Sequence, residues 1–155
     1  MSNEHETGET FVLFEIAGTT YALPSRDVRQ LEMIEHITPV PNASEAVEGV
    51  VFSRGQVIPA ISLRTRFGFP KIEFDVRSRL IVVEVNGRNI GLIADAAHEF
   101  KRIPADAINP PSENLEGTSG KYLQAIATLS SRIILLLNLP EVVKIGEEIE
   151  TEVEN

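Results

Sequence analysis

Histidines are the side chains that most often carry acid–base or metal chemistry at neutral pH, and the chain has three of them: His5, His36 and His98. His36 follows Glu35 and His98 precedes Glu99, so each could belong to an acid–base pair, although such neighbours also occur as solvated surface pairs. The sequence contains no glycine-rich phosphate loop, nucleophile elbow, paired-histidine metal motif or calcium loop. We therefore expect no enzymatic activity, no cofactor and no metal.

Composition limits the partners that the chain can bind. At 155 residues and 43% hydrophobic content, it is expected to form one compact domain with its own core. A formal net charge of −9 disfavours nucleic acid and anionic lipid as main partners. The absence of cysteine excludes disulfides and thiolate chemistry and suits a reducing cytosol. With no apolar run of membrane-spanning length and no export signal, we expect a cytoplasmic protein.

A small β-barrel that binds single-stranded nucleic acid is an alternative from a different functional class. Such barrels stack bases on aromatic residues inside a basic groove. The chain has few aromatic residues, no tryptophan and an excess of acids. Four arginines flank the centre of the chain and could form a basic patch or a solvated face: Arg64, Arg66, Arg77 and Arg79.

Two hairpins can be located from turn chemistry. Residues 80–85 and 90–93 are mostly apolar and flank Asn86-Gly87, the dipeptide that best suits a tight turn with positive φ at both central positions. Near the N-terminus, the apolar residues 11–16 lead through a turn at 17–20 into Tyr21-Ala22-Leu23. The chain therefore begins each half with a β-hairpin.

The two halves have similar hydrophobic patterns. Gly18 and Gly87 lie 69 positions apart, and the same offset aligns the strands around them. The apolar stretches 57–63 and 133–139 correspond at an offset of 76. Either an internal duplication or the shared physics of two β-rich lobes explains this similarity.

Helical segments are expected to be short. Residues 63–67 predict one or two turns that end before Gly68 and Pro70, Ser25 could cap a short turn, and Pro140 suits a first helical turn. The expected layout is an acidic tail over 1–9, one domain over 10–145 with lobes at about 10–75 and 76–145, a connection over 69–78, a long loop over 104–120 and an acidic tail over 146–155.

The most informative motif is Arg54-Gly55, which lies between two apolar strands. In a type II turn Gly55 would take the position with positive φ, and Arg54 would display its side chain at the tip. A guanidinium held there can form two parallel hydrogen bonds with a partner's carboxylate. The alternative is that Arg54 only keeps the turn soluble.

Around this turn the chain resembles the CheW family of chemotaxis coupling proteins. The family hallmark is a glycine, a short apolar strand, asparagine-leucine-arginine-glycine, an apolar strand with a proline, and then aspartate-leucine-arginine. The matching residues are Gly49, Arg54, Gly55, Pro59, Leu63 and Arg64. The resemblance covers about residues 10–143, including the 91–95 stretch and the strand at 132–139. The chain departs from the pattern at Phe52, Ser53, Ser62 and Ala96.

The resemblance implies an all-β fold with short helices, in which two five-stranded SH3-like barrel lobes pack together. It also implies a non-catalytic adaptor that links the cytoplasmic tip of a methyl-accepting chemoreceptor to the regulatory domain of a CheA-type histidine kinase, and that is recruited to receptor arrays by these partners. Other CheW-like domains are further possible partners. A divergent paralogue serving a non-flagellar sensory pathway is the alternative within this class.

The resemblance also assigns two surfaces. The receptor-facing groove would use Ile37, Val47, Gly49, Arg54, Ile93, Ala94, Asp95 and Ala96. The kinase-facing surface would use Val40, Pro41, Asn42, Ala43, Ser44, Glu45 and Ala46. The apolar members of both sets could instead be core residues, since a β-lobe buries one face of each strand whatever it binds.

Overall fold

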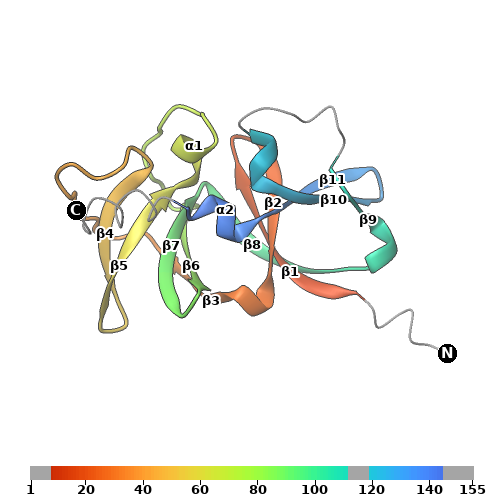
Figure 1. Ribbon diagram of the computed structural model, residues 1–155, viewed down its shortest axis with the longest axis horizontal. Coiled ribbons are helices and arrows are strands. Elements are labelled where there is room, and N and C mark those ends of the chain that lie inside the picture. Colours follow the sequence, from red (N-terminus) through yellow and green to blue (C-terminus); the bar gives the residue numbers. More distant parts are fainter. Residues whose placement is uncertain (1–7, 112–118, 145–155) are drawn as a thin grey trace.

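The computed structural model describes residues 8–111 and 119–144, which form two β-sheets with short helices (Figure 1). Sheet A has the strand order β8-β1-β2-β11-β10-β9. Its strands are β1 (Glu9–Ile16), β2 (Thr19–Pro24), β8 (Ala96–Ile103), β9 (Ile108–Asn109), β10 (Leu123–Leu129) and β11 (Arg132–Leu137). Sheet B has the order β3-β6-β7-β5-β4. Its strands are β3 (Val28–Met33), β4 (Val47–Ser53), β5 (Gln56–Ser62), β6 (Arg79–Val85) and β7 (Arg88–Ala94). The predicted all-β fold of two lobes is confirmed, and sheet A has a short sixth strand, β9.

The two halves of the sequence exchange strands. Sheet A joins β1 and β2 from the first half to β8–β11 from the second, while sheet B joins β3–β5 to the β6–β7 hairpin. The predicted lobe boundary near residue 75 is therefore wrong. The reason is that β1 pairs with β8 and β2 pairs in parallel with β11, so each opening hairpin completes the sheet of the other half. Neither half can form its sheet without the other.

The exchange follows the same pattern in both sheets. Corresponding strands occupy the same places in β8-β1-β2-β11-β10 and β3-β6-β7-β5-β4. The helices that follow β5 and β11 also correspond: α1 (Leu63–Arg66) is capped by the side chain of Ser62, and α2 (Leu139–Val142) by that of Asn138. A common strand order with equivalent caps favours internal duplication over chance similarity of pattern.

The remaining expectations on short elements are met in part. Helices form at both predicted places, and Gly68 follows α1 with φ +89°. The described residues also contain three 3₁₀ turns: η2 (Ser25–Asp27), η3 (Ala105–Ala107) and η4 (Ser119–Tyr122). Ser25 lies inside η2, where Pro24 holds the capping position. The expected tail over 1–9 is too long, because β1 begins at Glu9; the rest of that tail, residues 112–118 and the C-terminal tail lie outside the described residues.

Three apolar clusters stabilise the fold. One cluster lies within sheet A and includes Phe11, Leu13 and Ile134. A second lies within sheet B and includes Val51, Ile58, Ala60, Leu80, Val82 and Ile93. The largest cluster contains residues from both sheets, among them Phe14, Leu23, Ile81 and Leu92. Strand β1 contributes side chains to both faces of sheet A, since four consecutive residues are all buried: Phe11, Val12, Leu13 and Phe14. This continuous burial ties the two lobes into one unit.

Four tight two-residue turns connect the hairpins, and both central residues of each have positive φ. These turns are Ala17-Gly18, Arg54-Gly55, Asn86-Gly87 and Ser130-Ser131. The type II turn predicted at Arg54 is wrong: Arg54 itself has φ +50°, which suits a type I′ turn and the right-handed twist of the flanking strands. A residue with a Cβ pays a conformational cost there.

The turn that lacks glycine allows a test of this cost. Ser131, with φ +69°, is exposed, so Ser131→Gly is expected to stabilise the fold by about 0.5 to 1 kcal/mol, because glycine adopts positive φ without a Cβ clash. Chemical denaturation measures the effect. The reciprocal change Gly87→Ser, at φ +79°, is the control and is expected to destabilise by a similar amount. Equal stability of all three proteins would contradict this account.

Candidate protein-interaction site

The residues predicted to face a receptor lie in two separate places. Ile93 in β7 pairs with Ser62 at the end of β5, whereas Arg54 lies in the turn that precedes β5. Ser62 lies eight positions after Arg54 along the chain, which corresponds to roughly 25 Å in an extended strand. Arg54 and Asp95 therefore do not meet in one small pocket.

The first place is the tip of the β4–β5 hairpin. We call Arg54, Met33, Phe52 and Val57 the tip surface. Phe52 and Val57 are cross-strand partners with 74% and 65% of their surface exposed, and Met33 is also exposed. The side chain of Arg54 is exposed and makes no hydrogen bond or ion pair with any described residue. A groove of about 580 Å³ lies between this hairpin and the 32–38 segment. An exposed cation beside exposed apolar groups is typical of a protein-binding surface.

A polar cluster supports the hairpin from behind. The hydroxyl of Ser53, which is buried, donates to Glu32 Oε2 at 2.6 Å and accepts from Gln30 Nε2 at 2.9 Å. Gln30 also donates to Glu32. Because β3 and β4 are the two edge strands of sheet B, these bonds close the gap between them. Ser53, a departure from the family pattern, therefore has hydrogen-bond partners in this chain, the side chains of Gln30 and Glu32.

Gly49 has a structural role. A Cβ on Gly49 would lie 2.2 Å from the carbonyl oxygen of Thr38, which exchanges backbone hydrogen bonds with the neighbouring Val50. Ile37 packs against the sheet B cluster, and Val47 packs against the cluster between the sheets. These three predicted receptor residues thus hold the 37–38 segment against β4 and contribute to the core.

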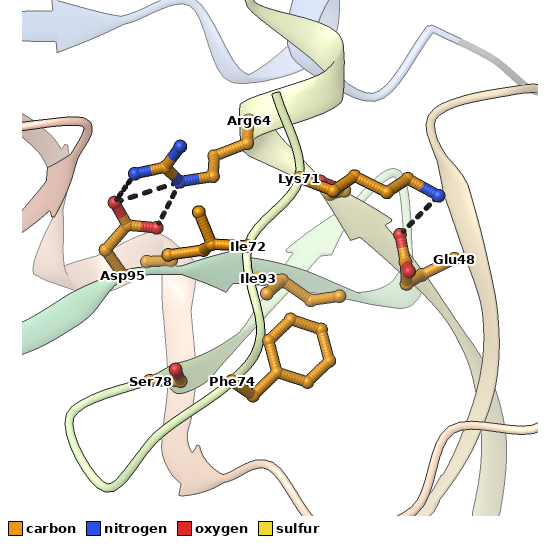
Figure 2. A pocket seen from close by; sticks show the side chains of 10 residues that line it. Glu48, Arg64, Lys71, Ile72, Phe74, Ser78, Ile93 and Asp95 are labelled. Atoms are coloured by element: carbon orange, nitrogen blue, oxygen red, sulfur yellow. Dashed lines mark hydrogen bonds and ion pairs between the residues drawn. The ribbon is translucent and has the colours of Figure 1, made fainter. Parts of the chain in front are cut away.

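The second place is the start of the β7–β8 junction, where the predicted contact residues are covered. Ile93, Ala94 and Ala96 are only 6%, 1% and 2% exposed, so they cannot touch a partner in this conformation. Ala94 packs in the cluster between the two sheets, and Ile93 packs in the sheet B cluster. Ile72 and Phe74, from the segment that follows α1, line the same small pocket as Ile93 and cover it from outside (Figure 2). We call residues 69–78 the strap. The sequence identified this segment as a connection but gave no sign that it folds back over β7.

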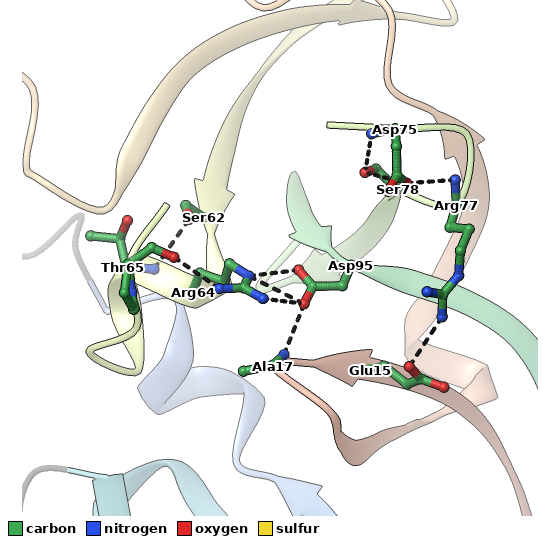
Figure 3. Close-up of polar contacts among 10 residues, drawn as sticks. Glu15, Ala17, Ser62, Arg64, Thr65, Asp75, Arg77, Ser78 and Asp95 are labelled. Atoms are coloured by element: carbon green, nitrogen blue, oxygen red, sulfur yellow. Dashed lines mark hydrogen bonds and ion pairs between the residues drawn. The ribbon is translucent and has the colours of Figure 1, made fainter. Parts of the chain in front are cut away.

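Asp95 joins the two sheets. Its carboxylate accepts hydrogen bonds from Arg64 Nε and Nη2, both at 2.9 Å, and from the backbone N–H of Ala17 at 2.8 Å (Figure 3). Its own N–H donates to the carbonyl of Glu15. The hydrogen bond to Asp95 raises the pKa of Arg64 above its ordinary value, so the guanidinium stays charged. Asp95 is thus a structural joint between α1 and the first turn of sheet A.

The segment predicted to face the kinase is largely a surface loop. Val40, Pro41, Asn42 and Glu45 are exposed, whereas Ala46 is buried and its carbonyl accepts from Ser62 N–H. The loop precedes β4 and therefore lies on the same lobe as the tip surface. Ala46 is the member of this predicted set that a partner cannot reach.

The other candidates from the sequence do not form a site. The four arginines contact protein groups: Arg64 binds Asp95, Arg77 binds Glu15, Arg66 lies against Tyr122, and Arg79 donates to the carbonyls of Val76 and Ser78. They do not line a common basic groove. His36 is exposed and forms no acid–base pair with Glu35 in the part of the chain described; the side chain of His98 and all of His5 lie outside it. No helix in that part is long and apolar enough to cross a bilayer.

A two-lobed β-domain with three exposed apolar side chains and an exposed arginine at one hairpin tip has the features of a protein-interaction module. The chain matches the CheW-like domain family over residues 10–147 and belongs to that family. It is 32% identical over 136 residues to chemotaxis protein CheW of Helicobacter pylori, covering 86% of this chain and 81% of that protein. It is 26% identical over 138 residues to chemotaxis protein CheW of Bacillus subtilis, covering 89% and 88%. The crystal structure of scaffolding protein TtCheW from Thermoanaerobacter tengcongensis is similar with a TM-score of 0.82 and 32% identity, covering 88% and 93%.

The structural role of Gly49 can be separated from a binding role by stability measurements. Gly49→Ala is expected to destabilise the fold by about 2 kcal/mol or more, because the new methyl group meets a backbone carbonyl that cannot move freely. Gly87→Ala is the matched control: its Cβ meets open space, so only the cost of positive φ remains, about 1 kcal/mol. If Gly49→Ala is no more harmful than the control, Gly49 is not held by this contact.

The joint at Asp95 leads to a second stability prediction. Asp95→Asn is expected to destabilise the fold by about 1.5 to 3 kcal/mol, because the guanidinium of Arg64 is only 18% exposed and loses its charged acceptor. Glu15→Gln removes the exposed Arg77–Glu15 pair and is expected to cost less than about 1 kcal/mol. Urea denaturation of both variants decides the point, and equal effects would show that Asp95 is an ordinary surface residue.

Proposed function

We propose that the protein is a non-catalytic adaptor that couples the cytoplasmic tip of a chemoreceptor to the regulatory domain of a CheA-type histidine kinase. The observation that carries the proposal is the tip surface, an exposed arginine with no ion pair to any described residue beside three exposed apolar side chains. The names of the relatives support it, since they are called chemotaxis proteins and a scaffolding protein. Adaptors of this kind work in the cytoplasm and reach receptor arrays through their partners.

The shape of sheet B suits an elongated partner. The side chains of Glu48, Val50 and Phe52 alternate onto the outer face of β4. Val50 and Phe52 line the groove beside the tip surface, and Glu48 borders the strap. A helical bundle lying along β4 would therefore reach both places that the sequence had assigned to one groove. About seventeen helical residues span the roughly 25 Å between these two places, at 1.5 Å per residue.

Arg54 would supply the polar anchor of this contact. Its backbone is in the left-handed region, where asparagine or glycine would be less strained, so the arginine side chain is retained at a conformational cost. A guanidinium that lines the same groove as Phe52 and Val57 would lose water on binding and would pair strongly with a carboxylate of the receptor tip. The exposed 40–42 loop, on the same lobe, is the proposed contact for the kinase regulatory domain.

Coupling follows from holding both partners on one rigid lobe. Sheet B is closed by the Ser53 cluster and joined to sheet A by Asp95, so a shift of the receptor bundle against β4 would be transmitted to a kinase domain held by the neighbouring loop. The protein contributes fixed geometry in this proposal and no bond-making step.

The proposal is tested by reversing the charge of the tip. Arg54→Glu is expected to weaken binding of a purified chemoreceptor signalling-tip fragment by about 2 to 5 kcal/mol, measured by calorimetry, because it replaces a desolvated ion pair with repulsion. The melting temperature should change little, since an exposed turn substitution shifts stability by about 0.5 kcal/mol or less.

The second half of the chain offers a matched control. Ser130 occupies the equivalent turn position of the β10–β11 hairpin, with φ +49° against +50° for Arg54. Ser130→Glu adds a negative charge in the same backbone geometry and is expected to leave receptor binding unchanged. Normal receptor binding by Arg54→Glu, or an equal loss in Ser130→Glu, would contradict the proposed role of the tip surface. Binding of the kinase regulatory domain, measured separately, shows whether the two contacts are independent.

A further inference from the structure

The strap covers a place that a partner lying along β4 would need. Its residues Ile72 and Phe74 lie against Ile93, and the enclosed space that remains is only about 20 Å³, close to the room one water molecule needs (Figure 2). No side chain of a partner fits into that space. A partner that inserts a side chain beside Ile93 must therefore move the strap first.

The middle of the strap is weakly held. The backbone groups of residues 71–74 make no hydrogen bond with the described part of the chain. Phe74 is 44% exposed, so only part of its surface gains from burial. By contrast, both ends contact the rest of the protein: Arg64 Nη1 donates to the carbonyl of Pro70 at 2.9 Å, and Arg77 Nη2 donates to Glu15 Oε1 at 3.2 Å. The strap is thus built like a segment with two hinges and a loose centre.

One ion pair joins the centre of the strap to β4 across the small pocket beside Ile93. Lys71 Nζ lies 3.5 Å from Glu48 Oε1, and that oxygen is buried without a hydrogen bond. An ion pair this long, with the lysine side chain 58% exposed, contributes little and is weakened by salt. Glu48 also belongs to the outer face of β4. A partner on β4 would therefore compete directly with Lys71 for this carboxylate.

We propose that the strap is a displaceable gate, in which Ile72 and Phe74 occupy the groove beside Ile93 in the free protein and the Lys71–Glu48 pair latches them. The proposal rests on the proposed function for the identity of the partner, a receptor helical bundle, but the opening itself belongs to the free chain. Opening exposes Ile93 and Ser62 and frees Glu48 to accept from a basic group of the partner. The apparent Kd for the partner then equals the Kd of the open form divided by the fraction of molecules that are open.

A single introduced cysteine reports opening without any partner, because the chain has no cysteine of its own. Ser62 lines the groove, is 6% exposed, and differs from cysteine by one atom. The rate at which Ellman's reagent labels Ser62→Cys should follow the open fraction. Adding Phe74→Ser is expected to raise that rate about fivefold, and Lys71→Glu, which turns the latch into a repulsion, about threefold. Val76→Ser is the control within the strap: Val76 is 77% exposed and does not line the groove, so the rate should not change.

The same variants in the cysteine-free chain separate a gate from a contact surface. Phe74→Ser is expected to bind the receptor signalling-tip fragment about fivefold more tightly, since removing a competitor raises the competent fraction. If Phe74 were instead a contact residue, the same change would weaken binding. Weaker binding, or a labelling rate that Phe74→Ser leaves unchanged, overturns the gate.

Failure of the gate and failure of the proposed function give different results. If the fragment binds neither the native chain nor Phe74→Ser while labelling still accelerates, the gate stands and the receptor assignment fails. If Arg54→Glu abolishes binding while Phe74→Ser leaves the labelling rate unchanged, the adaptor function stands and the gate fails. Ile93→Cys serves as a second reporter in case the loss of the Ser62 cap of α1 lowers stability in the first.

Discussion

The fold depends on the exchange of strands between the two halves of the chain. Each sheet is a hairpin from one half added to three or more strands from the other, so no lobe exists before both halves are present. This makes long-range pairing obligatory and ties the lobes through the shared cluster that includes Phe14 and Ile81. Asp95 reinforces the arrangement at one point, because a single carboxylate binds Arg64 of one lobe and the Ala17 turn of the other. The rigidity that a coupling protein needs follows from this topology.

The two lobes present different side chains on the same framework. Arg54 and Ser130 occupy equivalent turns with nearly the same φ, yet only the first turn carries a charge and is flanked by two exposed apolar residues of its own hairpin, Phe52 and Val57. The closing contacts differ as well, since sheet B uses the buried Ser53 cluster, whereas sheet A has an exposed pair between Glu99 and Arg132. A duplicated framework can keep its backbone geometry while one copy acquires a binding surface, because turn side chains contribute little to the core.

The departures from the family hallmark are explained by local packing in two cases. Ser53 would be an unsatisfied buried hydroxyl if Glu32 and Gln30 did not lie beside it. Ser62 caps α1 through its side chain, a role that aspartate fills equally well. Phe52 is different, since it is exposed at the hairpin tip and gains nothing from the fold. Its presence there is consistent with a partner that covers it.

The sequence alone predicted the β-class, the hairpins at Ala17-Gly18 and Asn86-Gly87, the short helices after Ser62 and Asn138, and the exposure of Arg54, because each of these depends on neighbouring residues and on alternation within one strand. Only the tertiary structure showed that the halves exchange strands, since hydrophobic pattern does not specify which half a strand pairs with. It also showed that part of the predicted receptor-facing groove is covered. Ile93 and Ala94 look the same in sequence whether they face a partner or the strap, and the covering segment is a loop whose position no local pattern encodes. Asp95 and Arg64 lie 31 positions apart, so their pairing, which turns a predicted contact residue into a structural joint, depends on how the chain folds in space.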